Sequence, residues 1–382
     1  MYQCSEAFHA AVANGNEQKA MLIFDDCVFT DDDISLDRGI EFRDYFNTDE
    51  DLSIGLTPSN EISFSLFNDK RLLNSYEFGD FLATIGVQTG EQTYQQFYPV
   101  QMTTDRGTWT GDDSYPYVRK NGTPLQVQPG FSVKSMIGYD SKVWVFSDTG
   151  RYAVYSDIDS TNITALNPIS AFMQEKSKAL AGKGIFYNKN SRVMFIYEGG
   201  ERRMFEFVPL GWFTAERPKA PDVIQIDMTC YDWMQKFEQD MPGPAELGIT
   251  YPTTIGNLLK KMCDYVGVAC ETTTFINSEA RIAKVPDDFE SVTMRDVLKW
   301  IAEAAGSNAR FNRDGKLELA WLKTTGQTYH ATGYSEFNPY WYQTKKITRL
   351  YNKDTQESTE RYYGSGTEGY LIQDNPLLRG VS

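Results

Sequence analysis

Residues 222–232 constrain the fold most, because apolar and polar side chains alternate there with a period of two. The apolar set is Ile224, Ile226, Met228 and Cys230, and the other set is Gln225, Asp227, Thr229 and Tyr231. Successive side chains of a strand point to opposite faces, so this pattern predicts a strand with one buried face. Residues 20–30 and 52–67 are also typical of strands, and Glu61–Phe67 within the second range alternates in a similar way. A short helix is expected after the first pattern, at Asp232–Gln239.

Residues 99–204 have a different character, with short aromatic runs between frequent turn signals. The runs include Lys142–Phe146 and 192–197, and the turn signals include Asn121-Gly122, Pro129-Gly130 and Gly199-Gly200. Asn-Gly pairs favour tight hairpins, because both central residues of such a turn need positive φ angles. This segment therefore predicts an inserted β-rich module, which one helix at Ser170–Leu180 interrupts.

Residues 252–322 predict a compact unit with two helices and a hairpin. The first helix opens at Pro252 and closes at Gly267, with an apolar stripe of Ile255, Leu258, Leu259, Met262 and Val266. The second starts at Thr293, where Thr293 and Asp296 have the spacing of a capping box. Residues 309–311 and 316–321 then predict a hairpin that turns through Asn312–Gly315.

The chain of 382 residues is long enough for two or three domains. We expect an α+β, β-dominated protein: residues 1–98 with 205–245 form a tube-like β-barrel or sandwich, and 99–204 are the inserted module. Residues 246–325 form a small two-helix α/β domain, and residues 326–382 begin a second β-domain. Strands are expected there at 346–351 and 370–373.

The charge argues against a nucleic-acid groove. The chain has 52 acidic and 37 basic residues, a net charge of −15, whereas affinity for nucleic acid depends on Lys and Arg that neutralise phosphates. Residues 1–60 carry 13 acidic and 3 basic side chains, and residues 176–203 carry 2 acidic and 7 basic ones. Both segments are typical of solvated surface, with a functional electrostatic field as the alternative.

The sequence has no recognisable catalytic equipment. The two histidines, His9 and His330, lack metal-spaced partners, and the five cysteines have no CxxC spacing, which is typical of reduced thiols. Gly364–Gly369 matches GxGxxG between polar segments rather than between a strand and a helix, so we interpret it as a loop. Residues 31–37 resemble a calcium loop but have Leu36 at the position of the required glycine. Paired carboxylates occur at 25–26, 112–113 and 287–288, as expected by chance in an acidic chain.

From these features we expect no catalytic residue, no cofactor-binding residue, no metal site and no cofactor, and hence a protein that is not an enzyme. The N-terminus has no basic and apolar signal segment, and no uncharged apolar run approaches a membrane span.

Four stretches resemble one family. They are 39–69, 251–268, 295–319 and 366–376, which include Gly39–Gly55, Tyr251–Leu259, Arg295–Gly306 and Asp374-Asn-Pro376. In their order and number they resemble the tail-hub proteins (baseplate-hub or tail-associated proteins) of siphophage-like prophages of Gram-positive bacteria. The resemblance spans most of the chain and is weakest across 99–204.

The resemblance implies a homotrimer at the distal end of the tail tube, located in the virion tail tip and synthesised in the host cytoplasm. Its implied partners are the distal tail ring protein, the tape-measure protein and tip or fibre proteins. DNA only passes through, an acidic lumen would repel it, and residues 31–51 are the candidate lining. Charge reversal of Asp31–Asp33 to Lys would then slow genome ejection.

Two alternatives stay open at this stage. One is a peptidoglycan-degrading tail hydrolase, and the other is a carbohydrate- or receptor-binding adhesin whose contact face is the 99–204 module. Related hubs continue past the Asp-Asn-Pro stretch, so we expect a fragment or a shorter variant.

Overall fold

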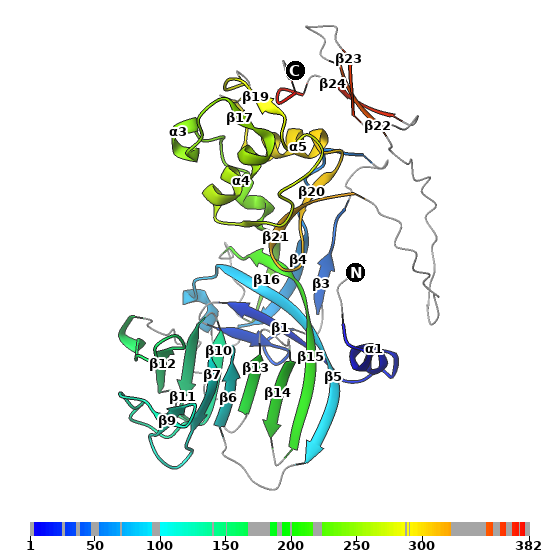
Figure 1. Ribbon diagram of the computed structural model, residues 1–382. Coiled ribbons are helices and arrows are strands. Elements are labelled where there is room, and N and C mark those ends of the chain that lie inside the picture. Colours follow the sequence, from blue (N-terminus) through cyan, green and yellow to red (C-terminus); the bar gives the residue numbers. More distant parts are fainter. Residues whose placement is uncertain are drawn as a thin grey trace. The chain divides into compact units, whose positions relative to one another are not determined.

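The computed structural model describes most of the chain (Figure 1). The described residues are 4–24, 27–35, 39–46, 53–68, 71–93, 100–139, 141–149, 151–166, 184–188, 193–198, 201–216, 224–286, 289, 291–321, 349–353, 360–363, 369–373 and 375–378. Strands dominate and helices are few, which confirms the α+β, β-rich class. The chain divides into unit 1, residues 1–42 and 62–230, and unit 2, residues 43–61 and 231–382.

Unit 1 is built on one large sheet. Its strands are β1 (Gln18–Phe24), β2 (Val28–Thr30), β3 (Ile40–Arg43), β4 (Glu61–Phe67), β5 (Asp80–Thr93), β13 (Gly184–Asn188), β14 (Val193–Glu198), β15 (Glu201–Thr214) and β16 (Gln225–Asp232). Their order is β2-β1-β5-β15-β16-β4-β3, and β14, with β13 beyond it, also pairs with β15. Figure 1 shows β5 and β15 as two long antiparallel neighbours. β2 and β3 lie at the two ends of this order and do not pair with each other, so the described strands form an open sheet rather than a closed barrel.

The two alternating segments form strands as predicted. Burial alternates along β16, and the inward residues of β4 and β16 meet in one core: Ile62, Phe64, Leu66, Ile226, Met228 and Cys230. One expectation was wrong, because Ile224 is 66% exposed. Its carbonyl accepts from the Asn68 N–H, and β16 begins only at the next residue. Residues 20–30 contain two strands rather than one, β1 and β2, which pair antiparallel. The strand predicted at 52–67 begins only at Glu61, since residues 53–60 are not part of a strand.

Two small sheets follow in the 99–204 region. One contains β6 (Val100–Thr104), β7 (Gly107–Gly111), β8 (Val118–Lys120) and β9 (Thr123–Pro124), and the other β10 (Ser135–Tyr139), β11 (Lys142–Phe146) and β12 (Tyr152–Ser156). Asn121 and Gly122 both have positive φ between β8 and β9, which confirms the predicted hairpin turn. The helix predicted at 170–180 lies outside the described residues.

The β10–β12 sheet is buried on both faces. Val143, Val145 and Tyr155 pack into a core shared with β6–β8, whereas Trp144, Phe146 and Val154 pack into the core of the large sheet. This explains why β11 is a continuous run of buried residues instead of an alternating one. The module is therefore joined to the large sheet through a common core.

Unit 1 also contains helix α1 (Glu6–Ala13), which lies against β5, and the short 3-10 turns η1 (Leu72–Ser75) and η2 (Thr164–Leu166). Ser5 caps α1, since its hydroxyl accepts from the Phe8 N–H at 3.0 Å.

Unit 2 contains the predicted α/β unit. Its elements are η3 (Trp233–Phe237), α3 (Pro244–Leu247), β17 (Thr253–Thr254), α4 (Ile255–Val266), β18 (Ala269–Cys270), β19 (Arg281–Ile282), α5 (Met294–Ala304), β20 (Asn308–Phe311) and β21 (Lys316–Ala320). The helices bury the predicted stripes against the β18-β21-β20 sheet, with Cys263 in place of the half-buried Val266. The capping box of Thr293 and Asp296 is present. Helix α4 begins at Ile255, three residues later than expected, because Thr253 and Thr254 pair with β19.

Three further strands lie toward the C-terminus: β22 (Arg349–Lys353), β23 (Glu360–Tyr363) and β24 (Gly369–Gln373). They form one sheet in the order β23-β22-β24. Within the described ranges, none of the helices combines the length and the apolar character needed to cross a membrane.

The doubly buried sheet yields a prediction about stability. Trp144→Ala should lower the free energy of unfolding by about 3–5 kcal/mol, because it opens a cavity between β11 and the large sheet. Urea unfolding followed by circular dichroism measures this. The control is Tyr115→Ala, whose side chain is 69% exposed and whose loss should cost less than about 0.5 kcal/mol. Equal effects of the two substitutions would contradict the shared core.

Candidate functional site: the strap on the α/β unit

Residues 43–61 leave the large sheet after β3, cross the α/β part of unit 2 and return at β4; we call them the strap. Of these, 43–46 and 53–61 are described. Ile54 is 4% exposed and belongs to the core that α4 and α5 share. The strap is thus part of unit 2, although the helices of that unit lie some 200 residues further along the sequence.

The strap pairs with the start of β20 through its backbone. The Gly55 N–H donates to the Ser307 carbonyl at 2.9 Å, and the Ala309 N–H donates to the Leu56 carbonyl at 2.9 Å. Gly55 has a φ of +81°, and a Cβ there would lie 3.0 Å from the Cβ of Glu303. Glycine is therefore required where the strap passes over α5.

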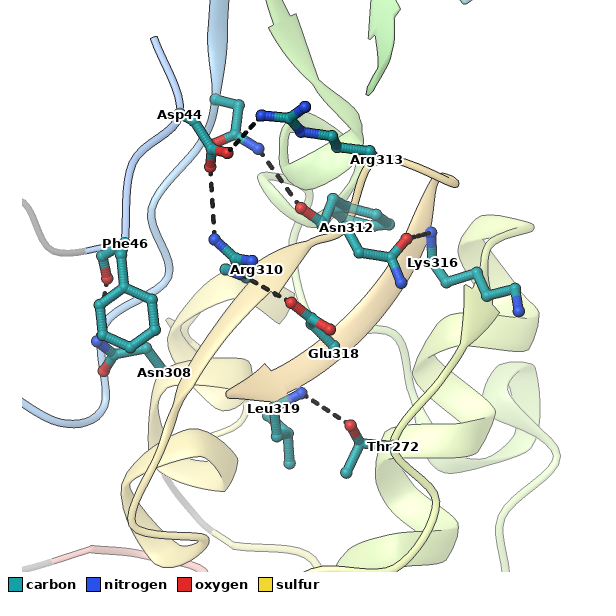
Figure 2. Close-up of polar contacts among 12 residues, drawn as sticks. Asp44, Phe46, Thr272, Asn308, Arg310, Asn312, Arg313, Lys316, Glu318 and Leu319 are labelled. Carbon is teal, nitrogen blue, oxygen red and sulfur yellow. Dashed lines mark hydrogen bonds and ion pairs between the residues drawn. The ribbon is translucent and has the colours of Figure 1, made fainter. Parts of the chain in front are cut away.

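Asn308 holds the strap at two points. Its side chain is fully buried, and its Oδ1 accepts from the Leu56 N–H at 3.0 Å. Its Nδ2 donates to the Phe46 carbonyl at 3.1 Å (Figure 2). One amide thus satisfies a donor and an acceptor of the strap that its backbone pairing with β20 leaves without a partner.

An ion network holds the first residues of the strap. Arg310 lies between Glu318, at 2.8 Å, and Asp44, at 3.4 Å, and Arg313 approaches Asp44 to 3.7 Å (Figure 2). The Arg310 guanidinium also lies 5.8 Å from the centre of the Phe46 ring. These side chains are 23–36% exposed, so each pair contributes little alone and the network mainly fixes orientation.

Asn60 and Asp232 form a buried clasp at the other end of the strap. The Asp232 carboxylate accepts from the Asn60 N–H at 2.9 Å, the Ser59 hydroxyl at 2.8 Å and the Met234 N–H at 3.1 Å. The Asn60 carbonyl in turn accepts from the Asp232 N–H at 3.0 Å, and its side-chain Oδ1 accepts from the Tyr45 N–H at 2.9 Å. The clasp therefore joins both ends of the strap.

Burial raises the pKa of Asp232 to about 6, although its three hydrogen bonds and Arg295 act in the opposite direction. The residue is only 2% exposed, so desolvation of the charged form is the larger effect.

A cleft of about 450 Å³ lies beside the strap. It is lined by Leu56, Thr57, Pro58, Ser59, Glu238, Thr293, Arg295, Asp296 and Lys299. Arg295 donates to the Thr57 hydroxyl at 3.2 Å and is ion-paired with Glu238, while Lys299 lies 3.1 Å from Asp296. The two cations of the cleft are thus each paired with one of its carboxylates.

The fourth stretch of the resemblance also reaches this unit. The Asn375 amide donates to the Trp300 carbonyl at 2.8 Å and to Glu303 at 2.9 Å. Leu377 and Leu378 are buried in the core of α4 and α5. Burial raises the pKa of Glu303, and the bond from Asn375 opposes that shift.

The structure places the acidic residues 31–33 in a turn after β2. Asp31 lies 3.0 Å from the Lys19 ammonium, and Asp33 accepts from the Thr30 N–H at 2.7 Å, whereas Asp32 is exposed. Asp31 and Asp33 thus stabilise the local turn, and charge reversal of both would disrupt it. Asp32 is the position at which a charge change leaves these bonds intact.

The other residues considered above are not brought together into a site. Asp112 accepts from the N–H groups of Ser114 and Tyr115 in a local turn, and His9 lies exposed on α1. His330, both other carboxylate pairs, the first five residues of the GxGxxG segment and half of 176–203 lie outside the described residues. Among the residues that are described, no group of three or more metal-ligating side chains occurs.

The sequence reasoning missed the residues that hold the strap: Asn60, Asp232, Arg295 and Asn308. One signal was present, because Asp232 continues the apolar set of the alternating strand. A carboxylate on a buried face needs hydrogen-bond partners and therefore points to a polar clasp.

No protein-family model matches this chain, and no curated protein matches its sequence. Among solved structures, a 43 kDa tail protein of prophage MuSo2 from Shewanella oneidensis is similar with a TM-score of 0.32 and 8% identity. The match covers 93% of this chain and 72% of that one.

Asn308→Ala should lower the free energy of unfolding by about 1–3 kcal/mol, because the partly buried Leu56 N–H and Phe46 carbonyl lose their partner. Hydrogen exchange at the Leu56 amide should accelerate as well. Lys299→Ala is the control, because its half-exposed ion pair is expected to contribute less than about 1 kcal/mol. An Asn308→Ala protein as stable as this control would rule out the role of Asn308 in holding the strap.

The raised pKa of Asp232 predicts a particular pH dependence. The folded-state pKa of about 6 lies above the ordinary aspartate value of 3.8, so the folded protein binds the proton more tightly than the unfolded chain. Acidification from pH 7 to pH 4 should raise the unfolding free energy of the native protein relative to Asp232→Asn by on the order of 2 kcal/mol. Urea titrations of both proteins across this range measure the difference. A difference that falls on acidification would mean that the hydrogen bonds outweigh burial.

Proposed function

We propose that this chain is a structural protein of a phage tail. Within that class, we propose the hub at the distal end of the tail tube, assembled as a homotrimer that forms part of the channel for genome delivery. The observation that carries the proposal is that all four family-like stretches contact one another within unit 2. They are spread over more than 330 residues of sequence and were selected by resemblance alone.

Contacts between individual residues join the four stretches. Gly55 of the first stretch passes over Glu303 of the third, and Asn375 of the fourth donates to the same Glu303. The second stretch contributes α4, which packs against α5 in the shared core. Residues that a family keeps for packing are expected to touch one another, so these contacts support the resemblance as a whole.

The proposed hub role also implies particular partners. We propose that the distal tail ring protein, the tape-measure protein and tip or fibre proteins dock on the trimer, and that DNA passes without specific binding. The acidic balance supports this, since a lumen rich in carboxylates repels phosphates. Asp32 is a candidate for that lining.

The chain should self-associate into trimeric rings. Light scattering coupled to size exclusion should give three times the 43.5 kDa subunit mass, and negative-stain electron microscopy should show threefold rings with a central hole of roughly duplex width. Particles that stay monomeric across the accessible concentration range would contradict the trimeric hub. A zymogram with peptidoglycan serves as the control for activity and should stay blank.

A further inference from the structure

Cys263 and Cys270 lie against each other at the end of α4. Cys270 packs against the core that contains Cys263, the two thiols interact, and both are free. The chain brings them together through a reversal at Gly267. There the Gly267 N–H donates to the Asp264 carbonyl at 3.3 Å and the Val268 N–H donates to the Cys263 carbonyl at 3.0 Å, the two bonds of a Schellman motif.

The two thiols have different surroundings. Cys263 is 1% exposed within the core of unit 2, whereas Cys270 is partly exposed on β18 and its S–H donates to the Thr272 carbonyl at 3.3 Å. Thr272 is itself fixed, because its hydroxyl accepts from the Leu319 N–H at 3.1 Å (Figure 2). Cys270 is thus the more exposed thiol of the pair, and Cys263 is buried in the core.

The pKa values of the two thiols also differ, and the more exposed thiol, Cys270, has the lower pKa. The hydrogen bond from Cys263 lowers the pKa of the Cys270 thiol, since it stabilises the thiolate, while burial and the charges of Glu271 and Asp264 oppose that shift. Lys316 lies 2.8 Å from Glu271 and neutralises part of this opposing charge. The same hydrogen bond, followed by burial, raises the pKa of Cys263. Cys270 is therefore the attacking thiol of the pair.

We propose that Cys263 and Cys270 form an oxidisable dithiol, which low-molecular-weight disulfides convert into an intramolecular disulfide. The Cys270 thiolate attacks one sulfur of the reagent, a mixed disulfide forms, and the first small thiolate leaves. Cys263 then gives up its proton to solvent and attacks the Cys270 sulfur, which expels the second small thiolate. Two protein thiols are oxidised, and one small disulfide is reduced to two thiols.

The disulfide would join the end of α4 to β18 by a covalent bond. It closes a ring within the unit that holds the strap, and it should make that unit harder to unfold. If the chain is a virion protein, as proposed above, the bond would form after release from a reducing cytosol into an oxidising medium. This timing rests on the proposed function, whereas the thiol chemistry does not.

The test uses the full chain and oxidised glutathione as the probe. The protein is incubated with it, denatured, alkylated with iodoacetamide and digested with trypsin. The peptide Met262–Arg281 contains both cysteines and no other. It should appear unalkylated and two hydrogen masses lighter than the reduced peptide, and the Tm of the oxidised protein should rise and return on reduction.

Two variants separate the steps. Cys263→Ser should stop at a glutathione adduct on Cys270, and Cys270→Ser should leave the buried Cys263 unmodified. Cys4→Ser, in unit 1, is the matched control and should still form the disulfide. A native peptide that keeps both thiols, or that accumulates the adduct without ring closure, would overturn the proposal. Either result is independent of whether the chain forms trimeric rings, and circular dichroism verifies that each variant is folded.

Discussion

The strap must satisfy its backbone hydrogen bonds without belonging to a sheet, and unit 2 is organised around this constraint. A buried N–H or carbonyl without a partner costs more than a typical hydrogen bond contributes, so each of these groups needs a fixed partner. Asn308 and Asn60 supply two contacts each through their amide side chains. Asp232 supplies a carboxylate that accepts three bonds, and its raised pKa is the electrostatic cost of that position. The apolar core of α4 and α5 can then close over Ile54.

Unit 1 meets a different constraint, because a sheet with two apolar faces needs cover on both sides. The β10–β12 sheet provides one layer for the large sheet and is covered in turn by β6–β8. On the opposite face of the large sheet, Met21, Ile23, Phe205 and Phe207 form a separate small cluster. A surface insertion would have its own core and a solvated boundary. The β-rich module instead shares a core with its host, which ties any surface that it presents to the rigid part of the unit.

The interactions of unit 2 also bear on the proposed role. A strap fixed at Asp44, Gly55, Asn60 and Asn308 couples a segment near the N-terminus to helices far along the chain. The dithiol lies in the same unit, where β18 pairs with β21. A bond formed there would stiffen the unit without altering the contacts that hold the strap.

The sequence by itself determined the local elements. Alternation predicted β4 and β16, capping predicted the start of α5, and Asn121-Gly122 predicted its hairpin, because these signals depend on neighbours within a few residues. Only the tertiary structure decided that the sheet stays open, that β10–β12 is buried on both faces, and that the strap belongs to unit 2. Asn60, Asp232 and Asn308 became a site for the same reason: their partners lie about 170 to 260 residues away in sequence. No periodicity encodes such pairings, since they arise only when distant segments pack around one core.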